Sequence, residues 1–422
     1  MIIKNAKIVV KGNETRIVDI RIENDKISKI LDNIENVGNE KIIDAGNNLT
    51  IPGGIDVHVH LREPGYEYKE TIKTGTMAAA KGGYTTILPM PNLNPHPDNV
   101  KAFEKYLNKI KQDAVVKVIP YSCITILSKG EELVDMEALN KIYGVRYFTD
   151  DGVGVDTEKI MKLAMIKAKE INGLIAAHTE DMSYRKLNSC VHDGENAKKN
   201  GWVGIPSETE FKQIERDLRL AEETGTKYHI CHISAKESVE LLRKSKDRGV
   251  DVSGEVTIHH LLLTEDDVKD TNAKMNPPLR TKEDRESLIN GLLDGTIDFL
   301  ANDHAPHSEE EKKQTMEKAP FGIVTIETAI PLFYTNFVKK GIITLEQFIE
   351  FTSLKPAKRF EIKGKGKIEE GYDADIVILS DDEEVINKEK FLSKGKNTPF
   401  DGYICQGFPK ITICGGKIVW EK

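Results

Sequence analysis

GIDVHVH, at residues 54–60, reads as a short buried strand that ends in two histidines, His58 and His60. A run of four to eight apolar and β-branched residues is typical of a strand inside a parallel sheet. Residues two apart on a strand project to the same side, so both imidazoles can bind one metal ion. Because a lone His-x-His is a weak signal, the surrounding sequence must decide what the pair means.

Seven more apolar runs follow, and longer helical stretches separate most of them. Helices are predicted over 69–82, 158–173 and 210–225, and the last two end at a glycine, a common helix stop. Alternation of strands and helices is the pattern of β/α units, and eight strands predict a TIM-type (β/α)8 barrel. The seven runs are YTTILPMPN (84–92), VVKVIPYSC (115–123), VRYFTD (145–150), LIAAH (174–178), KYHICHIS (227–234), VSGEVTIH (252–259) and IDFLAND (297–303).

Both ends of the chain have a different, strand-rich pattern. Residues 2–50 contain short strands separated by turns, and strands recur at 373–379 and 409–422, where Gly415–Gly416 supplies a hairpin turn. We therefore predict two domains. Residues 1–52 and 356–422 form one small β-sandwich domain, and residues 53–355, which lie between them in the sequence, form the barrel domain. The alternative is a pair of unrelated β flaps on the barrel.

Composition narrows the function classes. The 422 residues carry 60 basic and 68 acidic side chains, a net charge of -8, with no basic tract, so nucleic acid is not an expected partner. The five cysteines are scattered without a Cys-x-x-Cys pair, which fits a reducing compartment. The first residues do not resemble a signal peptide and no apolar stretch is long enough to span a membrane. A cytoplasmic protein is expected.

Metal-binding residue types fall at the ends of the predicted strands. In a TIM-type barrel the active site forms at the carboxyl ends of the strands, so these side chains should converge. Histidine and carboxylate are the ligands of zinc and similar ions. The residues are His58 and His60 on the first strand, Asp150 and Asp151 after the fourth, His178 on the fifth, His232 on the sixth and Asp303 on the eighth.

Several other histidines have competing interpretations. His229 and His232 should point to opposite faces of one strand, so His232, nearer the strand end, is predicted at the site and His229 between strand and helix. For His259–His260 a structural or supporting role is favoured over a ligand role. His304 should point away from its neighbour Asp303.

Taken together, these motifs resemble the dihydroorotase family of the amidohydrolase superfamily, in its long bacterial–archaeal form. The resemblance covers nearly the whole chain and implies the barrel, a terminal β-sandwich and a metal-dependent hydrolase of a cyclic amide. The motifs that carry it are GIDVHVHLREPG (54–65), PMPN (89–92), FTDDG (148–152), CHIS (231–234), EVTIHHLLLT (255–264), NPPLR (276–280), ANDHAPH (301–307), APFG (319–322) and KPAKRFEIKGKGKIEEGYDADIVIL (355–379).

The resemblance implies one or two zinc ions per subunit, and two are expected. It assigns His58, His60 and Asp303 to one ion and His178 and His232 to a second. Many relatives bridge the ions with a carboxylated lysine, but FTDDG holds no lysine, so an aspartate is expected to bridge. Asp151 fits the family register better than Asp150, and the alternative is that both aspartates only cap the following loop.

Zinc can activate water near neutral pH and polarise a carbonyl, and Asp303 would then carry the proton to the departing nitrogen. Arg62 offers a planar fork for a ring carboxylate, unless it only pairs with Glu63 or Glu67. The charged stretch 308–320 is either a solvated loop or a lid. The residues expected to bind substrate are His60, Arg62, Asn92, Asn276 and His307, with the backbone of Phe321 and Gly322.

The reaction implied is the zinc-dependent, reversible opening of L-dihydroorotate to N-carbamoyl-L-aspartate in pyrimidine (UMP) synthesis. The alternatives are another cyclic amidohydrolase (dihydropyrimidinase, hydantoinase or allantoinase) and an inactive scaffold for aspartate carbamoyltransferase. FTDDG and HLREPG disfavour the other cyclic amidohydrolases, and the complete set of predicted metal ligands disfavours the inactive scaffold. The expected partner is a small-molecule substrate, and a homo-oligomer and association with aspartate carbamoyltransferase both stay open.

Overall fold

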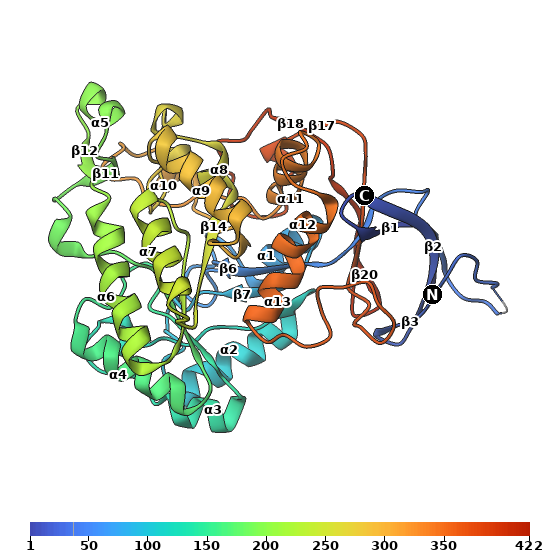
Figure 1. Cartoon of the computed structure of the whole chain (residues 1–422), viewed down its shortest axis with the longest axis horizontal. Coiled ribbons are helices and arrows are strands. Elements are labelled where there is room, and N and C mark those ends of the chain that lie inside the picture. The colour runs from blue at the N-terminus through green and yellow to red at the C-terminus, as the bar shows by residue number, and fades with distance from the viewer. Residues whose placement is uncertain (37) are drawn as a thin grey trace.

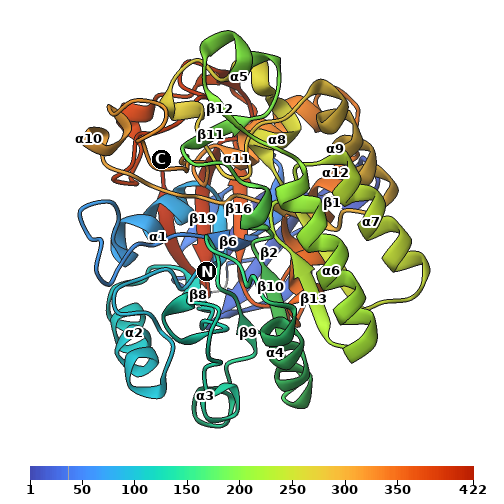
Figure 2. The same ribbon diagram turned by 90° about the vertical axis from the view of Figure 1, so that its left-hand side faces the viewer.

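Eight parallel strands form a closed ring. The computed structural model describes residues 1–36 and 38–422, and Figures 1 and 2 show it from two directions. One arc has the order β6–β7–β8 and the other β9–β10–β13–β14–β15. Isolated bridges join the arcs at Ser122–Phe148 and Val59–His304, so the predicted barrel is confirmed. The strands are β6 (Gly54–Val59), β7 (Tyr84–Pro89), β8 (Lys117–Val118), β9 (Tyr147–Phe148), β10 (Leu174–Ala177), β13 (Lys227–Ile230), β14 (Val252–Thr257) and β15 (Phe299–Ala301).

Helices surround the ring, and each predicted helix is present. In α4 the buried residues Met161, Ala164, Met165 and Ala168 recur at helical spacing and pack on the barrel. Helix α6 ends at Gly225, whose φ of 65° is the left-handed conformation that glycine adopts freely. The outer helices are α1 (Ile72–Lys81), α2 (Val100–Asp113), α3 (Met136–Tyr143), α4 (Glu158–Glu170), α6 (Glu208–Thr224), α7 (Lys236–Asp247) and α9 (Lys282–Asp294).

Apolar side chains fill the interior of the ring. One buried cluster takes members from strands all around it, including Ile55 on β6, Leu174 on β10 and Phe299 on β15. Phe360, which follows the short helix α13 (Lys355–Arg359), belongs to the same cluster. The polar side chains at the strand ends therefore lie next to a packed apolar interior.

Two four-stranded sheets form the second domain, and strands from both chain termini build it (Figure 1). One sheet has the order β3–β2–β1–β4 and the other β20–β19–β16–β5. A separate core that includes Ile20 and Ile376 fills the space between them, so the predicted β-sandwich is confirmed. The strands are β1 (Ile2–Lys11), β2 (Glu14–Glu23), β3 (Lys26–Leu31), β4 (Ile42–Asp44), β5 (Thr50–Pro52), β16 (Ile376–Leu379), β19 (Pro409–Cys414) and β20 (Lys417–Glu421).

Shorter elements connect these layers. The segment after β16 leaves the sandwich and reaches the barrel, where Ser393 donates to the buried Glu70 at 2.5 Å. Within the described residues, no helix has the length and apolar character to cross a membrane. The connecting elements are β11 (Ser189–His192), α5 (Glu195–Asn200), β12 (Val203–Ile205), α8 (Ile258–Leu262), α10 (Glu309–Lys312), α11 (Ala329–Phe333), α12 (Leu345–Ile349), β17 (Glu384–Val385) and β18 (Ile404–Cys405).

Candidate metal centre and active site

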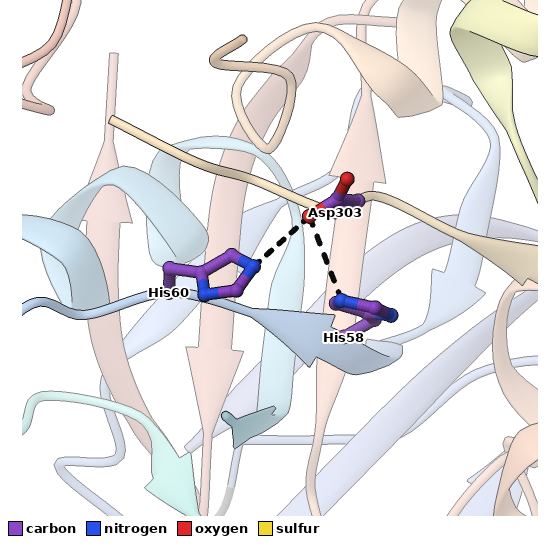
Figure 3. A group of neighbouring side chains, drawn as sticks. All are labelled: His58, His60 and Asp303. Atoms are coloured by element: carbon purple, nitrogen blue, oxygen red, sulfur yellow. Dashed lines mark hydrogen bonds and ion pairs between the residues drawn. The ribbon is translucent and has the colours of Figure 1, made fainter. Parts of the chain in front are cut away.

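His58, His60 and Asp303 meet at one end of the barrel (Figure 3). The Oδ1 atom of Asp303 lies 3.0 Å from Nε2 of His60 and 3.5 Å from Nε2 of His58. The two histidines come from β6, and Asp303 follows β15, the neighbouring strand across the ring closure. The structure thus brings together residues 243 positions apart in the chain.

Asp151 lies at the centre of the imidazole cluster. Its Oδ1 is 3.4 Å from Nε2 of His58, 3.8 Å from Nδ1 of His178 and 3.9 Å from Nε2 of His232. Its Oδ2 is 3.6 Å from Nε2 of His60. One carboxylate therefore faces both predicted histidine pairs, which is the position that a bridging ligand needs.

Asp150 points elsewhere and has a structural environment. Its Oδ1 accepts hydrogen bonds from the backbone N–H groups of Ile124 (2.8 Å) and Thr125 (3.2 Å), and the Thr125 hydroxyl donates to Oδ2. Burial raises the pKa of the Asp150 carboxyl to about 6, although these hydrogen bonds oppose the shift. Of the two aspartates in FTDDG, only Asp151 faces the histidines.

His178 and His232 complete the cluster, with Nδ1 of His178 3.0 Å from Nε2 of His232. His232 and Asp303 have φ values of 33° and 45°, and this left-handed backbone is uncommon outside glycine. Strained backbone of this kind concentrates at functional sites, where the surrounding fold holds it in place. Here it turns both side chains into the mouth of the barrel.

The prediction for His229 was wrong. Its ring lies inside the barrel, stacked on Phe299 at a centroid distance of 5.3 Å and edge-on to Phe360. Strict alternation placed His229 and His232 on opposite faces, but the positive φ of His232 breaks that alternation. Both imidazoles can therefore face the interior, His229 on β13 and His232 beyond the strand end.

The predicted ligand residues fit metal ions. Nε2 of His58 and Oδ1 of Asp151 lie 3.4 Å apart, and both atoms are buried without a hydrogen-bond partner within the described residues. Buried polar atoms without partners are rare in proteins, and a cation satisfies an imidazole nitrogen and a carboxylate oxygen that face each other. The ligand roles themselves stay predictions.

The charges of the cluster favour ionised carboxylates. Burial opposes ionisation of Asp151, but the imidazoles of His58, His60 and His178 outweigh it and hold its pKa well below the usual range. His58, His60 and His232 likewise lower the pKa of Asp303 against the effect of burial. Both carboxylates are therefore charged at neutral pH, as metal ligands must be.

Sequence reasoning missed Glu255, on β14. Its carboxylate accepts hydrogen bonds from Nδ1 of His58 (2.7 Å), Nε2 of His229 (2.9 Å) and the backbone N–H of His232 (3.2 Å). A proton on Nδ1 leaves the Nε2 lone pair of His58 free for a metal ion, the usual way in which an outer carboxylate orients a ligand histidine. A charged residue in a strand buried along its whole length was the signal that could have found it.

Glu180 was also missed. Its Oε2 lies 3.2 Å from Nε2 of His178 and 2.9 Å from Nδ2 of Asn276, while Arg185 pairs with Oε1. Burial opposes ionisation, yet His178 and Arg185 lower the pKa of Glu180 to about 2. Glu180 thus links the predicted substrate residue Asn276 to His178, a predicted ligand.

The other predicted substrate residues surround the same mouth. Nδ1 of His60 lies 3.0 Å from Oδ1 of Asn92, so Asn92 also orients a histidine that is predicted to be a ligand. Nη2 of Arg62 lies 3.3 Å from Nε2 of His307, which donates to the carbonyl of Phe321 at 2.8 Å. Burial and the cations of Arg62, Lys69 and Lys312 lower the pKa of His307, so its imidazole is neutral.

The alternative for Arg62, an ion pair with Glu63 or Glu67, does not occur among the described side chains. Glu63 lies 3.1 Å from Nζ of Lys109, and Glu67 accepts from the backbone N–H of Gly65. Arg62 instead donates through Nε to the carbonyl of Pro306 at 3.3 Å. Its guanidinium is therefore directed toward the segment that follows Asp303.

Three further histidines lie close to the centre without joining it. His260 has Nδ1 2.7 Å from the Thr257 hydroxyl and Nε2 3.1 Å from the Pro277 carbonyl, a structural pairing. His259 is fully buried, and both of its ring nitrogens lack partners within the described part of the chain. His304 accepts from the backbone N–H of Thr325 at 3.2 Å, so it points away from Asp303 as expected.

Comparison with known proteins agrees with this geometry. The Dihydro-orotase-like family model matches residues 47–238, and the Amidohydrolase family model matches residues 338–420. A dihydroorotase from Bacillus cereus (strain AH820) is 51% identical over 99% of this chain and 98% of its own length. One from Anoxybacillus flavithermus (strain DSM 21510 / WK1) is 50% identical over 100% of this chain and 98% of its own.

Solved structures with the same fold include hydantoinases. An L-hydantoinase (dihydropyrimidinase) from Arthrobacter aurescens has a TM-score of 0.89 at 28% identity and covers 100% of this chain and 96% of its own. A dihydropyrimidinase from Brevibacillus agri NCHU1002, at 24% identity and a TM-score of 0.86, covers 100% and 95% and supports the fold alone. With half of its residues identical to those of dihydroorotases over almost its whole length, the chain belongs to the dihydroorotase family of metal-dependent amidohydrolases, hydrolases that open a cyclic amide.

Proposed function

We propose that this site catalyses the reversible hydrolysis of L-dihydroorotate to N-carbamoyl-L-aspartate in de novo pyrimidine (UMP) biosynthesis. The observation that carries the substrate choice is the position of Arg62 beside His307 at the mouth that holds Asp303. A guanidinium binds a carboxylate through two parallel hydrogen bonds, and dihydroorotate carries a carboxylate on its ring. The full-length similarity to dihydroorotases supports the same choice.

We propose zinc as the metal and two ions per subunit. His58, His60 and Asp303 would hold one ion, His178 and His232 the other, and Asp151 would bridge them. Zinc supplies an activated water near neutral pH and polarises the carbonyl of the amide. The contacts of Asp151 with all four imidazoles support this assignment.

Asp303 is proposed as the general base and acid. The lowered pKa keeps its carboxylate charged at neutral pH, so it can take a proton from the attacking water. The same carboxyl group then returns the proton to the ring nitrogen as the amide bond breaks. The reverse reaction uses the proton transfers in the opposite order.

The polar side chains are proposed to divide substrate recognition. Arg62 and the neutral His307 face the ring carboxylate, and His60 lies beside them. Because Oδ1 of Asn92 accepts from His60, its Nδ2 is left to donate to the substrate. Because Nδ2 of Asn276 donates to Glu180, its Oδ1 is left to accept a ring N–H. The turn at Phe321–Gly322 is proposed to read the amide edge of the ring.

Other expectations remain part of the proposal. We place the domain boundaries at residues 1–52 with 356–422 and at 53–355, and the protein in the cytoplasm. Self-association and association with aspartate carbamoyltransferase are kept as proposed interactions. A role as an inactive scaffold is disfavoured because all the predicted ligand residues are retained and gathered.

A substrate panel tests the function. Purified zinc-loaded protein is given dihydroorotate, hydantoin, dihydrouracil and allantoin, and kcat/KM is measured for each. We expect dihydroorotate to be preferred, because the other rings lack the carboxylate that Arg62 would bind. The second candidate is a hydantoinase-type activity, which the structural likeness to the Arthrobacter enzyme favours. Preference for any of the other three rings would overturn our assignment.

A further inference from the structure

Two lysines are buried beneath residues 313–322, the segment that follows α10. Lys274 is 1% exposed and Lys312 is 6% exposed. Lysine is almost never buried this deeply unless it is paired with an acid. Neither ammonium group forms an ion pair with any carboxylate within the described residues, so both need another explanation.

Lys274 binds the backbone of that segment from below. Its Nζ donates to the carbonyls of Met316 (2.6 Å) and Ala319 (2.5 Å) and lies 3.4 Å from that of Glu317. The same Nζ lies 4.2 Å from the centroid of the Phe321 ring, a cation–π contact. One ammonium therefore holds both the backbone and the aromatic side chain.

Lys312 binds the far end of the same segment. Its Nζ donates to the carbonyls of Pro320 and Gly322, each at 3.0 Å, and lies 3.4 Å from that of Lys274. The N–H of Gly322 donates to the carbonyl of Lys274 at 3.0 Å. These contacts close a loop of hydrogen bonds between the two lysines and the turn at Phe321–Gly322.

Burying these two amines is energetically unfavourable. Burial, together with the charge of Lys274, lowers the pKa of Lys312 to about 7, and burial lowers the pKa of Lys274 to about 8. A methionine at either position would fill a similar volume without the cost of dehydrating an amine. The stretch 308–320 is thus not simply a solvated loop, because two buried polar anchors fix its backbone.

We propose that Lys274 and Lys312 are positioning residues, which hold the Phe321–Gly322 turn in the shape that recognises the substrate ring and so set substrate affinity. The inference rests on the proposed function, which assigns this turn to the substrate. Neither ammonium reaches the reacting atoms in this arrangement. The expected effect is therefore on KM and not on kcat.

The test replaces each lysine by methionine and uses Lys313→Met as the matched control. Lys313 follows Lys312 directly, but its side chain is 67% exposed and pairs with Glu309 at 2.9 Å. For Lys274→Met and Lys312→Met we expect KM for dihydroorotate to rise about tenfold, with kcat within about twofold and unchanged zinc content. Amide hydrogen exchange, measured without substrate, should accelerate at residues 319–322 and stay slow in the barrel strands.

An unchanged KM in both methionine variants would overturn the proposal. Amide hydrogen exchange that accelerates evenly over the whole chain would also overturn it, because that result indicates a merely structural role. If a methionine variant does not fold, Lys312→Gln keeps two N–H donors and is measured in the same way, with a smaller rise in KM expected. Failure of the proposed function is seen separately, since wild-type protein would then not turn over dihydroorotate. The KM comparison would in that case use the ring that the panel identifies, and the exchange readout needs no substrate.

Discussion

Replacing Glu255 with glutamine should weaken zinc binding without unfolding the barrel. The carboxylate accepts three N–H groups, from Nδ1 of His58, Nε2 of His229 and the backbone of His232. Glutamine keeps one acceptor oxygen, and its amide N–H group cannot face an N–H donor. If the amide faces His58, the imidazole proton moves to Nε2, the atom that faces Asp151 and Asp303.

The size of the effect follows from the contact. Loss of an outer partner of a ligand histidine typically costs about 10- to 100-fold in metal affinity. That range corresponds to about 1.4–2.8 kcal/mol. This carboxylate holds two predicted ligands, His58 through its imidazole and His232 through its backbone N–H, so we expect the upper half of the range for Glu255→Gln.

The measurement is a competition between metal-free protein and a chelating dye at pH 7, with circular dichroism to verify folding. Glu158→Gln is the matched control, because Glu158 is an exposed residue whose ion pair with Arg219 lies on the outer helices. A zinc affinity of Glu255→Gln within twofold of the wild-type value would refute the role we assign to Glu255. A loss of equal size in Glu158→Gln would point to a general charge effect instead.

Four substitutions and one calorimetric measurement give further tests of the site. Asp303→Asn should lower kcat by at least about 10²-fold with the fold intact, and near-normal turnover would exclude it as the general base. Asp151→Asn should reduce the amount of zinc bound per subunit. Asp150→Asn should keep its zinc and instead lower the free energy of unfolding by about 1–3 kcal/mol. Equal loss of zinc in both variants would contradict the assignment of Asp151 as the bridging ligand. Arg62→Met should raise KM for dihydroorotate about 10- to 100-fold, and an unchanged KM would rule out the carboxylate clamp. Burial favours a neutral His58, but the carboxylates of Asp151, Glu255 and Asp303 raise its pKa well above the usual range. The metal-free imidazole is therefore protonated at pH 7, and zinc must displace that proton when it binds. The calorimetric enthalpy of zinc binding should therefore differ between buffers of unlike ionisation enthalpy.

Much of the architecture is readable from the sequence. Short apolar runs alternating with amphipathic stretches predicted all eight barrel strands, and the strand-rich ends predicted the sandwich. The predicted ligand types fall at strand ends because parallel strands in a barrel share one polarity. Boundaries were less accurate: β8 is only Lys117–Val118, and Pro120, which has no N–H to donate, stands inside the predicted run.

The site needed the tertiary structure. Local alternation placed His229 outside the barrel, but the backbone of His232 adopts a left-handed φ that no periodic pattern predicts. Glu255 reaches His58 from 197 residues away, and Lys312 reaches the turn at Gly322 only because the chain folds back over it. The sequence by itself determined which elements form and which residue types stand at their ends, since both follow from local periodicity. Which atoms face one another was decided by the closure of the ring, because contacts between distant residues depend on packing that no short stretch encodes.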